Sequence, residues 1–96
     1  MIYITAIVKS KSAYLDGVKS VLENMVIETR KEKACIKYDL HQGIEDKNQF
    51  VFYEIWENQE GLNLHNQQPY IQEFISLPAD YLEEKPLVLL TQKIEK

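Results

Sequence analysis

The chain has 96 residues, of which 45% are hydrophobic and 27% are charged, and its formal net charge at pH 7 is −4. This length is enough for one domain, which we place over residues 1–96, with a core of modest size. The negative charge argues against nucleic-acid binding, which requires a basic patch or stripe. A single cysteine, Cys35, excludes an internal disulfide and a multi-cysteine zinc site.

The residues that follow Met1 form neither a basic leader nor a long apolar run. A signal peptide needs both features, and a membrane-spanning helix needs the second. We therefore expect a cytoplasmic protein that makes no membrane contact.

The first third of the chain predicts a strand followed by a helix. Apolar side chains recur at every second position over residues 2–9, a period typical of a strand. Ser12 suits the N-cap of a helix, and apolar residues at spacings of three and four carry that helix to about Lys31.

Two further strands are predicted over residues 35–42 and 50–57, where the alternation returns. The polar residues 43–48 between them form a connection short enough for a β-hairpin. The apolar side of the first of these strands is predicted to carry Ile36, Tyr38 and Leu40.

The last part of the chain predicts two short helical segments and a final strand. Asn58 offers the N-cap of a helix that reaches about Asn66, and Pro69 begins a new helical turn that ends near Leu77. Residues 79–84 are too few for an assignment, and residues 87–94 predict the last strand.

This order of elements, β-α-β-β-α-β, predicts an α+β ferredoxin-like fold with a four-stranded antiparallel sheet. Two helical segments cover only one face of such a sheet, yet the strands carry apolar side chains on both faces. Tyr3 and Ile7 lie opposite Ile4 and Val8, for example. Because a bare apolar face of this size is unusual on a monomer, we expect a homodimer through the open face.

His65 and Glu54 are the candidate catalytic residues. His65 lies on the inner stripe of its helix, and a histidine there suits a general acid or base. Glu54 lies between Phe52 and Trp56 on a largely apolar strand face, where a carboxylate must be paired or neutralised. Each residue has a structural alternative: a hydrogen-bonded core histidine, and a carboxylate that pairs with a lysine or tyrosine.

A set of spaced residues resembles the antibiotic biosynthesis monooxygenase (ABM) domain family over essentially the whole chain. The residues that carry this resemblance are Cys35-x-x-Tyr38, Phe50-x-x-x-Glu54-x-Trp56, His65 and Pro69. The resemblance implies a dimeric α+β barrel and a relation to cofactor-independent quinol and anthrone monooxygenases. Relatives often have Gly-Cys where this chain has Ala34-Cys35, which affects the local turn.

The haem-degrading branch of these relatives fits the chain poorly. That branch resembles a pattern with an asparagine in the first strand and a ligand histidine after the position of His65. This chain has Thr5 in the first strand and no histidine after His65. We therefore expect neither haem nor another cofactor, and no metal.

The resemblance implies a monooxygenase that acts with molecular oxygen on a small quinol-like or polyketide-like aromatic substrate. In this hypothesis His65 is the general base, Glu54 supports it, and Trp56 stacks on the substrate. The aromatic residues expected to line the substrate pocket are Trp56, Phe52, Tyr38, Tyr70 and Phe74. Two alternatives remain open: an isomerase or signal-degrading enzyme on a small hydroxy-carbonyl compound, and a non-enzymatic dimeric binding module in which His65 is structural.

Overall fold

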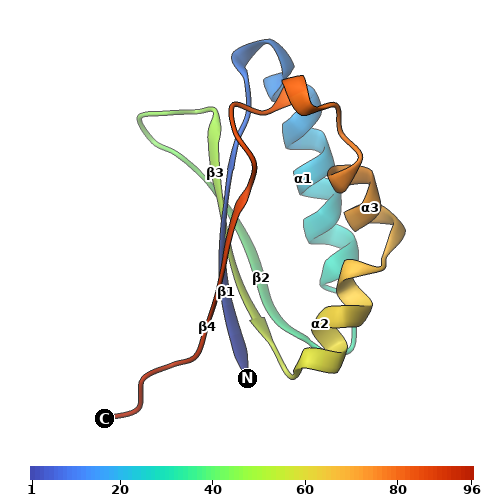
Figure 1. Ribbon diagram of the computed structural model, residues 1–96, viewed down its shortest axis with the longest axis vertical. Helices are drawn as coiled ribbons and strands as arrows, with labels where there is room; N and C mark the ends of the chain where they lie inside the picture. Colours follow the sequence, from blue (N-terminus) through green and yellow to red (C-terminus); the bar gives the residue numbers. More distant parts are fainter.

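The computed structural model describes all 96 residues and shows one sheet backed by helices on one side (Figure 1). The strands are β1 (Ile2–Lys9), β2 (Cys35–Gln42), β3 (Gln49–Trp56) and β4 (Leu87–Thr91). The helices are α1 (Leu15–Thr29), α2 (Gln59–Asn66) and α3 (Pro69–Ile75), with single 3-10 turns at Ser12–Tyr14 and Ala79–Tyr81.

The sheet has four antiparallel strands in the order β2-β3-β1-β4. The predicted α+β fold and its β-α-β-β-α-β order are therefore confirmed. The hairpin over residues 43–48 joins β2 to β3, as the spacing predicted. The final strand ends at Thr91, three residues before the predicted end at Ile94.

Strand β2 departs from the predicted alternation near its start. Cys35 lies opposite Trp56 and Lys37 opposite Ile55, so one residue of β2 has no partner and the register shifts. That extra residue is Ile36, which is 50% exposed. The prediction that Ile36 shares the core face was wrong, because a β-bulge interrupts strict alternation.

Two of the predicted helix starts are confirmed and one is wrong. The Asn58 side chain accepts a hydrogen bond from the Gly61 backbone N–H at 2.8 Å and caps α2. Pro69 occupies the first turn of α3, where its missing N–H costs nothing. Ser12 instead begins a 3-10 turn, and α1 starts at Leu15 without a side-chain cap.

The core lies between the helices and one face of the sheet. Most helix-facing side chains of β1 and β3 are buried, and α1 contributes Val18, Leu22 and Met25. The largest fully buried side chains are Trp56, Phe50 and Phe52, all on β3. Strand β3 occupies an inner position of the sheet, and α2 packs against it.

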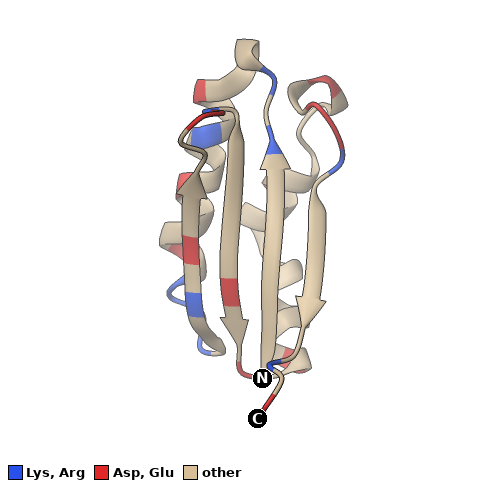
Figure 2. Ribbon diagram, turned by 90° about the vertical axis from the view of Figure 1, so that its left-hand side faces the viewer, with Lys and Arg blue, Asp and Glu red and all other residues tan.

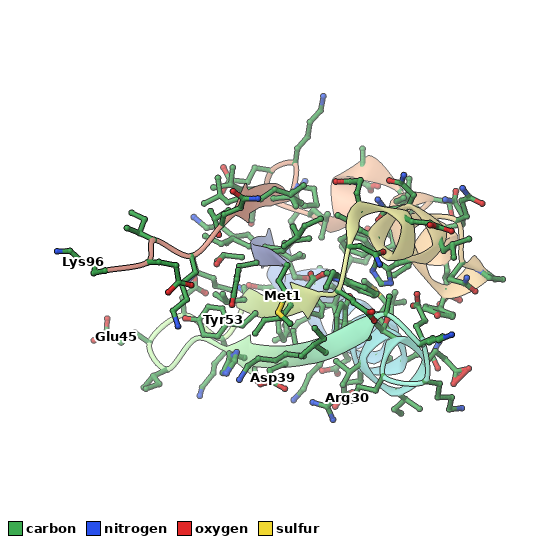
Figure 3. The ribbon with its side chains drawn as sticks, turned by 90° about the horizontal axis from the view of Figure 1, so that it is seen from below. Met1, Arg30, Asp39, Glu45, Tyr53 and Lys96 are labelled. Carbon is green, nitrogen blue, oxygen red and sulfur yellow. The ribbon has the colours of Figure 1, made fainter.

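The other face of the sheet has no helix in front of it, as Figure 2 shows. Residues on this open face include Tyr53, which is 48% exposed, and Leu89, which is 46% exposed. Figure 3 shows Tyr53 on the side of the sheet away from the helices. Among the helices, none combines the length and the apolar character needed to cross a bilayer.

Candidate functional site

A cavity of about 260 Å³ lies between the helix-side face of the sheet and α1, α2 and α3. Of its 17 lining residues, 12 are hydrophobic, and the ionisable ones include Glu54 and His65. Strand β4 contributes Val88 and Leu90 to the wall, and these side chains are half exposed. An apolar cavity with a few convergent polar groups is the usual form of a small-molecule site.

His65 enters this cavity from α2 and is only 4% exposed. Its Nδ1 atom lies 2.8 Å from Oε2 of Glu32, in the turn between α1 and β2. The Tyr70 hydroxyl donates a hydrogen bond to the same Glu32 oxygen at 2.6 Å. Burial lowers the pKa of His65, although the hydrogen bond and charge of Glu32 act in the opposite direction. The imidazole is therefore neutral at pH 7, which is the form that accepts a proton.

Glu54 enters the cavity from the middle of β3 and is 8% exposed. Its Oε1 atom accepts a hydrogen bond from the Trp56 indole N–H at 2.9 Å. Burial raises the pKa of Glu54 to about 7, and the Trp56 hydrogen bond only partly offsets this effect. Near neutral pH, this carboxyl group is able either to donate or to accept a proton.

Aromatic rings fix the position of the His65 imidazole. The ring centroids of Trp56 and His65 lie 4.4 Å apart, and those of Tyr38 and His65 lie 5.5 Å apart. Trp56 is completely buried, so its ring cannot shift without disturbing the core. Trp56 thus contacts both candidate groups, since it packs on His65 and binds Glu54.

The structure brings together most of the predicted site residues. His65, Glu54, Tyr38, Phe52 and Phe74 all line the cavity. Trp56 and Tyr70 are not among the lining residues, because Trp56 lies behind His65 and Tyr70 binds Glu32. The carboxylate on His65 belongs to Glu32 and the Glu54 carboxylate binds Trp56, so Glu54 is not the hydrogen-bonded partner of His65.

Sequence reasoning missed Glu32, which lies 33 residues before its partner His65. It belongs to a charged segment that also contains Arg30, Lys31 and Lys33, and nothing in that pattern separates a surface glutamate from a functional one. The nearby Cys35 thiol has a pKa raised to about 11, mainly by burial, so it stays protonated at neutral pH. A neutral thiol is a poor nucleophile, so Cys35 is not a candidate for nucleophilic catalysis.

Comparison with known proteins identifies the family. The sequence profile described as "Antibiotic biosynthesis monooxygenase" matches residues 1–77, which is most of the chain. The chain belongs to the antibiotic biosynthesis monooxygenase (ABM) family. Membership supports a monooxygenase-like role for this protein in general terms.

Similar proteins agree with this assignment. The protein named "Putative monooxygenase YcnE" from Bacillus subtilis is 26% identical over 95 residues, which cover 99% of this chain and 100% of that protein. An uncharacterized Synechocystis protein, sll1783, is 36% identical over 66 residues, which cover 69% of this chain but 44% of that protein. A crystal structure described as an antibiotic biosynthesis monooxygenase superposes with a TM-score of 0.92 at 25% identity and covers 99% of this chain and 100% of that one. The ABM assignment thus agrees in sequence and in fold.

Proposed function

We propose that this ABM-family protein is a cofactor-independent monooxygenase that oxidises a small quinol-like aromatic compound with molecular oxygen. The observation that carries the proposal is the placement of a buried, neutral histidine and a carboxyl group of raised pKa in one apolar cavity. His65 is the proposed general base, and Glu54 is the proposed second proton-transfer group.

In the proposed reaction the substrate supplies all the electrons. His65 takes a proton from a phenol or an activated C–H group, which leaves an electron-rich anion that is able to reduce oxygen itself. Oxygen then adds to a ring carbon that carries one hydrogen and forms a hydroperoxide. Its O–O bond breaks with loss of water, which leaves a carbonyl group at that carbon, so that the ring carbon and a phenol hydroxyl each lose one hydrogen overall. The apolar walls exclude bulk water from the reactive anion, and Glu54 is placed to donate or accept the second proton.

The size of the cavity is compatible with the proposed substrate class. An engineered apolar cavity of about 150 Å³ is enough to hold benzene. A volume of about 260 Å³ therefore leaves room for an aromatic compound larger than a single unsubstituted ring. Tyr38, Phe52 and Phe74 provide the aromatic contacts to such a ring.

We also propose that the protein is a homodimer that pairs through the open face of the sheet. Tyr53, Leu87 and Leu89 are each about half exposed on that face, and no element of the chain covers them. Each Å² of apolar area that a second copy buries stabilises the dimer by roughly 25 cal/mol. The cytoplasm stays the expected location.

An isomerase or signal-degrading reaction is the second candidate, because the same two groups suit proton shuttling on a small hydroxy-carbonyl compound. Burial lowers the pKa of His65 and raises the pKa of Glu54 to about 7, so burial favours the uncharged form of each group. That pairing serves proton transfer with or without oxygen. Oxygen consumption separates this candidate from the first.

The test is oxygen uptake by purified, chelator-treated protein with a panel of one-ring, two-ring and three-ring quinols. His65→Gln keeps an amide donor near Glu32 but removes the base. We expect uptake above the autoxidation rate with at least one quinol of the panel, and a fall of about 100-fold or more in His65→Gln.

His41→Gln is the matched control, because His41 is the other histidine of the chain and lies exposed on β2. We expect its rate to match the unmodified protein. Uptake that survives in His65→Gln would remove His65 as the base. An absence of uptake with the whole panel, combined with turnover of a hydroxy-carbonyl compound, would favour the isomerase; a lack of both would favour a binding module.

A further inference from the structure

We propose that Glu32 is a positioning residue for His65: it holds Nδ1 of the imidazole and so presents Nε2 to the cavity as the proton acceptor. This inference rests on the proposed role of His65 as a base. It adds a residue that lies outside the cavity and on a different segment of the chain, in the turn between α1 and β2.

The hydrogen-bond pattern fixes which imidazole nitrogen is free. An ionised carboxylate only accepts hydrogen bonds, so the Nδ1 atom at 2.8 Å must carry the hydrogen. The neutral ring then has its lone pair on Nε2. Since His65 lines the cavity and Nδ1 is taken by Glu32, Nε2 is the nitrogen left for a substrate.

Tyr70 holds Glu32 in its turn. Its hydroxyl donates to the same oxygen at 2.6 Å, so two donors from α2 and α3 converge on one carboxylate oxygen. Burial and the hydrogen bond to Glu32 raise the pKa of Tyr70, so the phenol keeps its proton across the working pH range. The Glu32 side chain is 14% exposed, and this partial burial strengthens its interaction with His65 relative to a surface pair.

The charge of Glu32 also has a role once the base has acted. When Nε2 takes the substrate proton, the ring becomes an imidazolium that carries hydrogens on both nitrogens. The adjacent carboxylate stabilises that cation, since opposite charges in close contact favour the charged form. Burial lowers the pKa of His65, and Glu32 acts against this effect. The imidazole therefore stays basic enough to take a proton.

Glu32→Gln tests the proposal without a substrate. The protein contains two histidines, so nitrogen and proton NMR of the imidazoles resolves His65, with His41 as an internal reference. We expect the Nε2-lone-pair tautomer to lose its dominance in Glu32→Gln and the pKa of His65 to fall further, while His41 is unchanged. Glu28→Gln is the matched control, since Glu28 lies one turn away and pairs with Lys31. An unchanged tautomer and pKa for His65 in Glu32→Gln would overturn the proposal.

The kinetic arm applies to any substrate that the oxygen-uptake panel identifies. We expect kcat of Glu32→Gln to fall by about tenfold to a hundredfold, comparable to the loss of an orienting carboxylate at other functional histidines. KM should change little. Glu54, whose pKa is about 7, also titrates in this cavity, so the diagnostic limb of the kcat/KM profile is the one that coincides with the NMR pKa of His65, and that limb should move to lower pH together with it. A uniform loss of activity with an unmoved pH profile would also overturn the proposal. The NMR experiment needs no turnover, so it still tests the role of Glu32 if the proposed oxygenase reaction fails.

Discussion

Two neighbouring rows of side chains cross the sheet on opposite faces and have similar chemistry. The helix-side row runs Leu90, Ile4, Glu54 and Tyr38, and the open-face row runs Leu89, Thr5, Tyr53 and Asp39. Each row contains a leucine on β4, one tyrosine and one carboxylate. Their surroundings differ: Glu54 and Tyr38 are 8% and 2% exposed, whereas Tyr53 is 48% exposed.

The two carboxylates show what that difference does. Burial raises the pKa of Glu54 to about 7. Asp39 has a lowered pKa, because Lys37 and Arg30 donate to it at the exposed edge of the sheet. Figure 3 labels Arg30 and Asp39 at this edge. Solvent exclusion, not residue type, therefore turns one of the two rows into a candidate site.

The largest effect on this comparison is expected for Glu54→Gln. The pKa of Glu54 is about 7 in the folded protein, against 4.5 ordinarily, so the folded state holds its proton more tightly than the unfolded state. The free energy of unfolding therefore falls as pH rises from 4.5 to 7, by at most about 3 kcal/mol. Glu54→Gln removes this pH-dependent loss. We expect the free energy of unfolding of Glu54→Gln, minus that of the unmodified protein, to increase from pH 5 to pH 8 when both are measured by urea unfolding.

Asp39→Asn is the control for that experiment. Its carboxyl group has a lowered pKa, so its contribution to stability is lost only as pH falls below its ordinary value of 3.8. We expect no relative change between pH 5 and pH 8 in Asp39→Asn. An equal pH response in the two variants would contradict the contrast between the faces.

A smaller effect is expected for Leu89→Glu, which places a charge on the open face. If this face pairs with a second copy, a buried unpaired carboxylate should weaken the dimer by at least about tenfold. Sedimentation equilibrium across a concentration series measures that change. Leu64→Glu is the matched control, because Leu64 is 54% exposed on α2. Monomeric unmodified protein at micromolar concentration would refute the proposed dimer.

The smallest effect is expected for Leu90→Ala, the immediate neighbour of Leu89. Leu90 is 54% exposed, but its side chain lines the cavity. Truncation removes apolar contact with a bound ring, so we expect KM to rise by about threefold to tenfold while the dimer dissociation constant stays the same. Steady-state kinetics and sedimentation of the same sample check both statements. If Leu90→Ala changed the dimer dissociation constant but not KM, the assignment of Leu90 to the cavity face of β4 would be wrong.

Local sequence signals were enough for most of the fold. Alternation located all four strands, and β1 and β2 have the predicted bounds. Asn58 and Pro69 marked helix starts, because capping and the missing proline N–H act within a single turn. The bulge at Ile36 escaped prediction, since an extra residue in a strand depends on the register of its partner.

The sequence by itself predicted the α+β fold, because strand and helix periodicity act within single elements. The resemblance of its spaced residues to the ABM family, together with their positions on the strand and helix, pointed to Glu54 and His65 as candidates. Only the tertiary structure decided that Glu32 holds His65 and that Trp56 lies behind the cavity wall. It also decided that β4 divides its leucines between the cavity and the open face. The physical reason is that hydrogen-bond partners and solvent exclusion arise from segments far apart in the chain, whose approach no local pattern encodes.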